Sequence, residues 1–308
     1  MKKPDLVIIG AGPAGLTAAI YARRAGKTTL ILEGENFGGQ ITHSPKVENY
    51  PGFPVISGME LADKLTEQVM ALGAEIELDR VTGVEKTADG FAIHGEAGDY
   101  AARAVIVAAG SHHRVLGLPG EEALVGNGIS YCAICDGAFY AGRHVAVIGG
   151  GNTALQEAVM LSEYCASVTL IQNLPFLTGE ESLAALLRAK ENVRFLFAHP
   201  VAGLIGEELL TGLLLRNSEG KEQILRTDGV FVAIGQVPEN TPFADVAELD
   251  ERGYFASDES CATKTPGLFV AGDCRNKRIR QITTATADGA VAALAACRYL
   301  DDPAVQNA

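Results

Sequence analysis

Apolar residues near the start of the chain fall into short unbroken runs that alternate with a stretch of helical spacing. Residues 6–9 form one such run, which is typical of a parallel strand buried on both faces. Residues 16–24 follow with the apolar spacing of a helix, and residues 28–32 form a second run. The chain therefore opens with a predicted strand, helix and strand.

The loop between the first strand and the helix reads GAGPAG. Its glycines Gly10, Gly12 and Gly15 have the G-x-G-x-x-G spacing of dinucleotide-binding folds. Such glycines let the backbone approach a pyrophosphate, and the N-terminus of the helix adds a positive dipole. The second strand ends at Glu33, where an acid binds ribose hydroxyls. Because these features occur in register, we predict dinucleotide binding here.

The same pattern occurs a second time, at a constant offset of 139 positions, in residues 144–172. Gly149, Gly151 and Ala154 take the places of the three glycines, and alanine is an accepted variant in the third place. At this offset Gln172 replaces Glu33, so the ribose-binding acid has become an amide. Two dinucleotide folds in one chain indicate a flavoprotein with FAD in one domain and a nicotinamide in the other. The alternative is a duplicated domain whose second copy has lost its ligand.

Two segments rich in Gly, Pro and polar residues, 111–120 and 235–243, follow apolar strands and are the expected crossings between domains. The second domain is then inserted into the first. We predict an α/β fold with two Rossmann-like, three-layer domains. Residues 1–112 with 242–308 would bind FAD, and residues 113–241 would form an NAD(P)H-binding-like domain that carries the redox cysteines.

Composition limits the classes of function. The 308 residues are 47 % hydrophobic and 20 % charged, a globular profile, and the net charge of −13 disfavours a nucleic-acid binder, which needs a basic face. Two lysines precede the first apolar run, as in a signal peptide, but the glycines and proline of residues 10–15 suit a loop better. We expect a cytoplasmic protein with no membrane or nucleic-acid partner.

The six cysteines include one close pair, Cys132 and Cys135, in the segment YCAICDG. In a reducing compartment, two thiols at C-x-x-C spacing can close a disulfide and reopen it. The alternatives are a zinc site, which would need a second such pair or nearby histidines, a structural disulfide, and a coincidental pairing of buried cysteines. Asp136 follows directly and can move a proton to or from a thiolate if it is partly buried. We predict a redox centre without a metal.

Further motifs occur in order and at familiar spacing: GGQI (38–41), VENYPGF (47–53), CAICDG, GGGNTA, VAIG, AGD and RQITTATADGAVAA. With them, essentially the whole chain resembles a low-molecular-weight thioredoxin reductase. The resemblance implies FAD in the first domain, a homodimer, and thioredoxin or a thioredoxin-like protein as partner. It also implies that the inserted domain rotates between two states about the two linkers.

The resemblance also implies roles for individual residues. Cys135 matches the thiol next to the flavin, Cys132 the thiol that attacks the thioredoxin disulfide to form a mixed disulfide, and Asp136 the general acid. Cys274, next to Asp273, could lie near the flavin, although packing is the stronger expectation. The three remaining cysteines are expected in the core: Cys165, Cys261 and Cys297. The positions implied for the two dinucleotides are Gly10, Gly12, Pro13, Ala14, Gly15, Glu33, Gly38, Gly39, Gln40, Asn49, Val81, Ala109, Gly110, Asp273, Arg280, Gln281 and Ile282, with Gly151, Asn152, Thr153, Gln172 and Ile234.

The chain departs from this resemblance where NADPH-using members carry a His-Arg-Arg motif and a further arginine. Residues 171–188 read IQNLPFLTGEESLAALLR, with no basic residue before Arg188. Arginine suits a 2′-phosphate because it offers a planar, permanently charged fork, whereas Glu180 and Glu181 would repel one. We therefore expect NADH, held through Gln172 and Asn173, or a non-nicotinamide donor such as ferredoxin or a reduced deazaflavin, in preference to NADPH.

Three other functions stay open. The flavoprotein component of a peroxide-reducing system shares the core but normally adds an N-terminal redox domain. A flavin-dependent dithiol oxidase would need oxygen access to the flavin and a substrate pocket beside the cysteine pair. An FAD-binding redox sensor would be unaffected by a serine at Cys135, which separates it from the enzymes.

Overall fold

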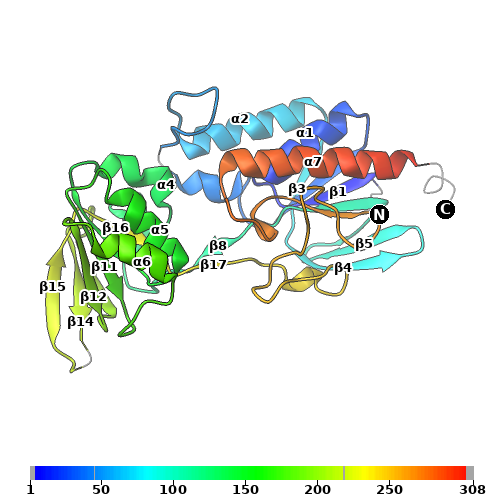
Figure 1. Ribbon diagram of the computed structural model, residues 1–308. Coiled ribbons are helices and arrows are strands. Elements are labelled where there is room, and N and C mark those ends of the chain that lie inside the picture. The colour runs from blue at the N-terminus through cyan, green and yellow to red at the C-terminus, as the bar shows by residue number, and fades with distance from the viewer. Residues whose placement is uncertain (1–3, 45, 218, 303–308) are drawn as a thin grey trace. The chain divides into compact units, whose positions relative to one another are not determined.

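The chain divides into two compact units in the computed structural model, which describes residues 4–44, 46–217 and 219–302. Unit 1 comprises Met1–His112 with Val237–Ala308, and unit 2 comprises His113–Gln236. The two crossings between the units, β8 (His112–His113) and β17 (Gln236–Val237), pair as a two-stranded ribbon (Figure 1). Unit 2 is therefore inserted into the chain of unit 1.

Unit 1 contains a five-stranded parallel sheet in the order β18-β7-β1-β2-β3 and a three-stranded antiparallel sheet in the order β4-β5-β6. Its elements are β1 (Leu6–Ile9), α1 (Pro13–Arg24), β2 (Thr29–Glu33), η1 (Gly39–His43), α2 (Gly58–Ala71), β3 (Glu75–Leu78), β4 (Val81–Thr87), β5 (Gly90–Gly95), β6 (Asp99–Ala102), β7 (Ala104–Val107), η3 (Thr241–Phe243), β18 (Leu268–Val270), η4 (Gly272–Cys274) and α7 (Ile282–Asp301).

Alternate residues of the parallel strands of unit 1 build two separate cores. Leu6 and Ile8 of β1 pack with residues of α1, α2 and α7 on one face, while Val7 and Ile9 pack on the other face with the β4–β6 sheet. The order of layers is thus helices, parallel sheet and antiparallel sheet, with the three long helices together on one side (Figure 1). Burial on both faces is the reason that these strands appear as unbroken apolar runs.

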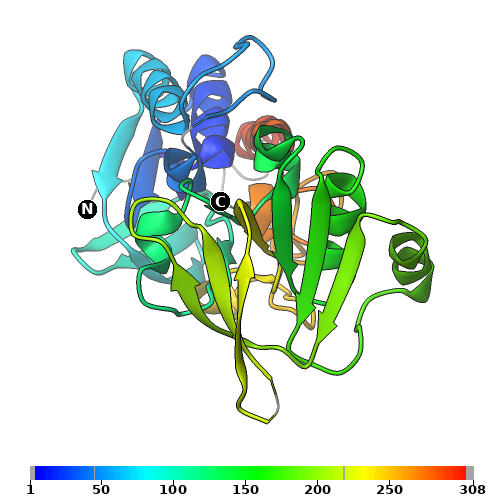
Figure 2. The ribbon, with the colours of Figure 1, turned by 90° about the vertical axis from the view of Figure 1, so that its left-hand side faces the viewer.

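Unit 2 has a parallel sheet in the order β12-β11-β10-β16-β9 and an antiparallel sheet in the order β13-β14-β15. Figure 2 turns these strands, drawn in green to yellow, toward the viewer. The elements are α3 (Glu121–Leu124), β9 (Ile129–Ser130), α4 (Ala133–Asp136), η2 (Gly137–Tyr140), β10 (His144–Ile148), α5 (Asn152–Leu161), β11 (Ser167–Gln172), α6 (Glu181–Arg188), β12 (Val193–Phe197), β13 (Val201–Ile205), β14 (Gly212–Arg216), β15 (Glu222–Arg226) and β16 (Gly229–Val232).

The two units share one topology. Leu6 pairs with Thr29 between β1 and β2, and the residues 139 positions later, Val145 and Val168, pair between β10 and β11. A three-stranded antiparallel sheet lies between β3 and β7 in the chain of unit 1 and between β12 and β16 in unit 2; the fifth parallel strand is the last one in unit 1 (β18) and the first one in unit 2 (β9). The predicted α/β class with two Rossmann-like, three-layer domains, the second inserted into the first, is confirmed.

Two predicted boundaries in the first repeat are wrong by a few residues. The helix begins at Pro13 rather than at residue 16, because proline is favoured in the first turn, where no intrahelical N–H bond is required. The second strand begins at Thr29 rather than at Thr28, and it ends at Glu33 as expected. Glu33 is therefore the last residue of the strand itself, which holds its backbone in the sheet.

Candidate active site

The glycine loop of unit 1 has two glycines that the fold requires and one that faces open space. Gly10 has φ +105°, and a Cβ atom there would lie 2.4 Å from the backbone oxygen of Ala108. A Cβ atom on Gly15 would lie 1.9 Å from the backbone oxygen of Gly10, so only glycine lets α1 pack this closely on β1. A Cβ atom on Gly12 would have no described atom within 4 Å. Gly12 is therefore the place where a ligand can approach the backbone.

The N-terminus of α1 lies directly beside this opening. Gly12 is the N-cap residue, and none of the described side chains caps the helix there. The first turn contains Pro13, Ala14 and Gly15 and carries no acidic residue. A helix start of this kind leaves backbone N–H groups and the positive end of the helix dipole for an anion such as a pyrophosphate.

Glu33 is held against the same loop by two backbone hydrogen bonds. Its Oε2 accepts from the backbone N of Ala11 at 2.6 Å, and its Oε1 accepts from the backbone N of Glu35 at 2.8 Å. Gly38 donates from its backbone N to the backbone oxygen of Ala11 at 2.8 Å, and Gly39 begins η1. Because each carboxylate oxygen can accept a second hydrogen bond, the fixed Glu33 can still bind ribose hydroxyls.

Asp273 brings a second carboxyl group to the glycine loop of unit 1. It lies in η4, where a Cβ atom on the preceding residue, Gly272, would lie 2.8 Å from the Cβ of Ala14. Its Oδ1 is buried and has no hydrogen-bond partner among the described residues. Burial raises the pKa of Asp273 to about 6, against the opposing effect of Lys277 and Arg280. A buried acceptor of this kind needs a donor such as a hydroxyl group.

These features fit FAD. An open glycine and an uncapped helix start suit its pyrophosphate, Glu33 suits its adenosine ribose, and the unpartnered Oδ1 of Asp273 suits a hydroxyl group between the phosphates and the flavin. The Oδ1 atom of Asp273 is the most specific of these observations, because a buried acceptor without a hydrogen bond destabilises the fold unless a ligand supplies the donor.

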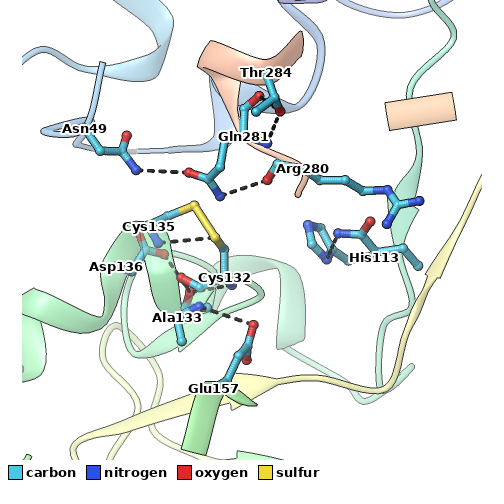
Figure 3. The surroundings of a disulfide bond; sticks show 12 residues. Asn49, His113, Cys132, Ala133, Cys135, Asp136, Glu157, Arg280, Gln281 and Thr284 are labelled. Atoms are coloured by element: carbon cyan, nitrogen blue, oxygen red, sulfur yellow. Dashed lines mark hydrogen bonds between the residues drawn. A yellow bond between two sulfur atoms is a disulfide. The ribbon is translucent and has the colours of Figure 1, made fainter. Parts of the chain in front are cut away.

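The segment before α7 holds three of the remaining predicted residues. Gln281 is the N-cap of α7 and forms a capping box with Thr284, and Ile282 is the first helical residue. Asn49 donates from Nδ2 to Oε1 of Gln281 at 3.2 Å (Figure 3). Arg280 donates from Nε to the backbone oxygen of Asp273 at 3.4 Å. The start of α7 is therefore tied both to the Asn49 loop and to η4.

The other predicted positions of unit 1 lie at the ends of strands and helices. Gln40, in η1, lies 3.1 Å from His112 between Nε2 and Nδ1. Val81 is the first residue of β4 and is buried. Ala109 and Gly110 follow β7 and are half-buried. Loops at the carboxyl ends of parallel strands are where ligands bind in such folds.

In unit 2, Cys132 and Cys135 form a disulfide with 5.3 Å between their Cα atoms (Figure 3). Cys132 is the N-cap of α4, and its Sγ accepts from the backbone N of Cys135 at 3.2 Å. The backbone N of Cys132 donates to Ser130 Oγ at 3.1 Å. A sulfur at a helix N-cap is placed where backbone N–H groups stabilise a thiolate.

Asp136 lies at the other end of α4 and is suited to hold a proton. Ser130 donates from Oγ to its Oδ2 at 2.6 Å, and its Oδ1 is buried without a hydrogen-bond partner in the described part of the chain. Burial raises the pKa of Asp136, while the Ser130 hydroxyl lowers it. Protonation supplies a donor at the buried Oδ1 atom, so Asp136 can act as an acid close to the disulfide.

Sequence reasoning missed two residues of this site, Ser130 and Glu157. Ser130 links Asp136 to the backbone of Cys132, and only the Ser-x-Cys spacing before the pair signals this contact. Glu157 accepts from the backbone N of Ala133 (Figure 3). The sequence signal for Glu157 is stronger than the one for Ser130, because Glu157 interrupts the apolar i, i+3, i+4, i+7 stripe of α5, between Ala154 and Ala158.

The other four cysteines are buried and free, and each belongs to a hydrophobic core. Cys274 packs in the core between the two sheets of unit 1, and its thiol donates to the backbone oxygen of Ala271 at 3.2 Å. The expectation that these four pack as small core residues is therefore confirmed.

The second glycine loop repeats the geometry of the first. Gly149 has φ +137°, and a Cβ atom there would lie 2.4 Å from the backbone oxygen of Ala233. A Cβ atom on Gly151 would meet nothing described closer than Thr178 Oγ1 at 3.8 Å. Asn152 and Thr153 open α5 and are exposed. This loop can accept a pyrophosphate in the same way as the loop of unit 1.

Gln172, the counterpart of Glu33, is engaged by its own loop. It is 6 % exposed; its Nε2 donates to the backbone oxygen of Phe176 at 3.3 Å, and its Oε1 accepts from the backbone N of Asn173 at 3.1 Å. Glu180 approaches the glycine loop, because its backbone N donates to Asn152 Oδ1 at 2.7 Å and its Oε1 accepts from Asn152 Nδ2 at 3.0 Å. Ile234 follows β16 and packs against the core of unit 2. Residues 171–187, all of them described, include no lysine, arginine or histidine that could supply the positive charge of a 2′-phosphate site.

The described residues form neither a metal centre nor a membrane-spanning helix. No group of three or more His, Cys, Asp or Glu side chains there could hold a metal ion. Nor does any described helix have the length and apolar character needed to cross a membrane.

Comparisons with known proteins show which family this chain resembles over most of its length. Residues 4–289 match the family model of pyridine nucleotide-disulphide oxidoreductases. The chain is 42 % identical over 303 residues to a 34.2 kDa protein in the rubredoxin operon of Clostridium pasteurianum, which covers 97 % of this chain and 98 % of the relative. It is 40 % identical over 300 residues to the thioredoxin reductase of Bacillus subtilis, and the match covers 97 % of this chain and 95 % of that protein. The crystal structure of thioredoxin reductase from Streptococcus pyogenes superimposes with a TM-score of 0.93 at 36 % identity, covering 97 % of this chain and 98 % of the other.

Proposed function

The chain belongs to the pyridine nucleotide-disulphide oxidoreductase family and, within it, to the low-molecular-weight thioredoxin reductases, and on that premise we propose that it reduces thioredoxin or a thioredoxin-like protein through Cys132 and Cys135. It is a flavoenzyme of the thioredoxin-disulfide reductase type. The observation that carries the proposal is the disulfide at the N-cap of α4 with Asp136 and Ser130 in contact around it.

The residues of unit 2 account for the thiol chemistry. Bound FAD supplies a two-electron reductant for the disulfide. Two-electron cleavage of the S–S bond, with uptake of one proton, leaves a thiolate on Cys132 and a thiol on Cys135. The resemblance makes Cys132 the nucleophile that attacks one sulfur of the partner disulfide. The other partner sulfur leaves as a thiolate and takes the proton held by Asp136. Cys135 then attacks the mixed disulfide, which releases the reduced partner and restores the Cys132–Cys135 bond.

We propose that the electron donor lacks a 2′-phosphate: it is NADH or a non-nicotinamide reductant such as a reduced ferredoxin or deazaflavin. The open Gly151 and the start of α5 support a pyrophosphate. The missing positive charge and the carboxylate of Glu180 at Asn152 disfavour an additional phosphate near the ribose. Gln172 can bind ribose hydroxyls only if it gives up one of its two bonds to its own loop.

Anaerobic titration of the flavin absorbance tests both parts of the proposal. NADPH, NADH and a chemically reduced ferredoxin or deazaflavin are added separately, and thioredoxin disulfide is then supplied in excess. We expect bleaching by NADH or by the non-nicotinamide donor, and recovery of the yellow colour when thioredoxin is added. Rapid bleaching by NADPH alone would refute the argument from the missing cations.

A Cys135→Ser variant separates the other candidate functions. It should lose thioredoxin reduction while a redox sensor that only binds FAD would be unaffected. A dithiol oxidase would consume oxygen with a small dithiol at a rate that thioredoxin does not change, and a peroxide-system flavoprotein would need a peroxidase partner instead. Each of these outcomes would replace the proposed substrate.

The resemblance further supports a cytoplasmic homodimer whose two units rotate about β8 and β17. The four free, buried cysteines suit a reducing compartment. Sedimentation of the flavin-loaded protein measures the oligomeric state, and a monomer at micromolar concentration would contradict the dimer.

A further inference from the structure

Glu157 places a second carboxyl group next to α4, at its first residue, Ala133, whereas Asp136 is its last residue. It lies on α5, and its Oε1 accepts from the backbone N of Ala133 at 3.5 Å (Figure 3). Ala133 is the first residue of α4, directly after the N-cap Cys132. The N–H group that Glu157 engages is therefore one of those whose dipole would otherwise favour negative charge on Cys132.

The rest of the Glu157 carboxyl group has no described partner. Its Oε2 is buried and accepts no hydrogen bond within residues 4–44, 46–217 and 219–302. Its neighbours on α5 are apolar: Ala154, Ala158 and Leu161 belong to the buried core. An ionised carboxylate here is stabilised by one long hydrogen bond and no cation, so burial raises the pKa of Glu157 to about 7. Near neutral pH a small change in nearby charge is enough to protonate it.

We propose that Glu157 is a positioning residue of the redox site, which takes up a proton when the Cys132–Cys135 disulfide is reduced and releases it when the disulfide reforms. The inference rests on the proposed function, since it requires a redox-active disulfide. A leucine or glutamine would fill the same apolar stripe of α5 at lower electrostatic cost, so packing alone does not account for a carboxyl group at this position.

The balance of charge explains why reduction of the disulfide is coupled to protonation of Glu157. Cleavage of the S–S bond by two electrons, which bound reduced FAD would supply, puts two negative charges on the sulfurs, and protons must offset them. One proton from solvent goes to Cys135, and Asp136 keeps its own proton for the sulfur that leaves the partner disulfide. A second proton from solvent neutralises Glu157 and so removes a negative charge that opposes the thiolate of Cys132. Reoxidation removes the sulfur charges, and Glu157 returns its proton to solvent.

Other titratable groups lie on the elements packed around Glu157, and they must be the same residues in every protein that the test compares. Tyr164, after α5, has a pKa raised by burial, by Cys165 and by the charge of Glu157. The remaining groups are on α4, α6 and β10: Cys135, Asp136, Glu181, Arg188 and His144.

The test measures the pH dependence of Cys132 alkylation in the flavin-loaded protein. The protein is reduced anaerobically with a phosphine and treated with iodoacetamide, and the modified peptide is quantified by mass spectrometry. In Glu157→Gln the amide oxygen still accepts from Ala133, but the charge is lost. We expect the midpoint of alkylation to fall by about half to one pH unit, and the disulfide to be reduced at a higher potential than in the unmodified protein.

A matched control and a second variant keep the result interpretable. Glu163→Gln removes the same charge from an exposed position that pairs with Lys190, and it should leave the midpoint unchanged. Glu157→Asp keeps a titratable carboxyl group but withdraws it from Ala133. Its alkylation midpoint should lie between those of Glu157→Gln and the unmodified protein. If Glu157→Gln does not fold, equal midpoints in Glu157→Asp and the unmodified protein overturn the inference.

The outcomes also separate this inference from the proposed function. If the Cys132–Cys135 disulfide of the unmodified protein cannot be reduced and reformed reversibly, the proposed function fails. If it can, and Glu157→Gln alkylates with the same midpoint as the unmodified protein and as Glu163→Gln, only the role of Glu157 fails.

Discussion

Replacing Gly12 by alanine should abolish tight FAD binding without unfolding the protein. Gly12 has φ −74° and ψ −179°, which alanine adopts without strain, and the added methyl group would have no described atom within 4 Å. We therefore expect the free energy of unfolding of the apoprotein to change by less than about 0.5 kcal/mol. The same methyl group lies where a pyrophosphate must approach the start of α1.

The loss of affinity follows from the hydrogen bonds at that place. A displacement of the pyrophosphate by about one ångström removes its bonds to the first free backbone N–H groups, each worth about 1.5–3 kcal/mol because the acceptor is charged. Loss of one or two of them weakens FAD binding by between about tenfold and about 20,000-fold. Titration of the deflavinated protein with FAD measures the affinity, and urea denaturation of the same sample measures the stability.

Two further substitutions complete the comparison. Gly15→Ala would place a Cβ atom 1.9 Å from the backbone oxygen of Gly10, so it should destabilise unit 1 itself. Gly151→Ala adds the same open methyl group in unit 2 and should leave FAD affinity unchanged. If Gly12→Ala binds FAD as tightly as the unmodified protein, the cofactor does not lie over this loop and the reasoning is wrong.

Three other predictions concern unit 2. Asp136→Asn should slow thioredoxin reduction by about a hundredfold or more; because the pKa of Asp136 is raised, the unmodified enzyme should lose activity as pH rises through that value, and the variant should lack this fall in its pH–rate profile. Glu157→Gln should be more stable than the unmodified protein above pH 7. The pKa of about 7 in the folded state exceeds the ordinary 4.5, so ionisation destabilises the folded state as pH rises between these values. The gain, measured by urea denaturation, should reach at most about 3 kcal/mol and vanish near pH 4.5; a gain of equal size at both pH values would contradict it. Asn173→Arg with Leu174→Arg should increase flavin reduction by NADPH about tenfold or more, and no increase in a stopped-flow measurement would show that unit 2 does not receive this nucleotide.

The repeated fold could be predicted from the sequence because its signals are local. A buried parallel strand, a glycine loop and a helix follow one another within a few residues, and the constant offset between Gly10 and Gly149 reveals the duplication. The two antiparallel sheets could not be predicted in the same way. Only one face of β14 packs against the parallel sheet, so its short pattern does not distinguish it from a surface loop.

The redox site could be predicted only in part. Cys132, Cys135 and Asp136 are adjacent in sequence, so their chemistry is visible there. Glu157 reaches Ala133 from another helix, and that contact exists only after α5 has packed against α4. The two bonds of Gln172 to its own loop likewise depend on how residues 173–176 turn after β11. Local motifs indicate which reaction the residues can perform, but tertiary packing determines which polar groups have no hydrogen-bond partner.

The electron capacity of the purified protein tests the central claim most directly. Anaerobic titration with dithionite is followed by flavin absorbance for the unmodified protein and for Cys135→Ser. The account predicts that the unmodified protein accepts twice as many electrons per flavin, because the disulfide stores one electron pair and the flavin another. It also predicts that thioredoxin disulfide withdraws electrons from the unmodified protein alone. Equal capacities in the two proteins would show that the Cys132–Cys135 disulfide does not exchange electrons with the flavin, and the proposed route would be wrong.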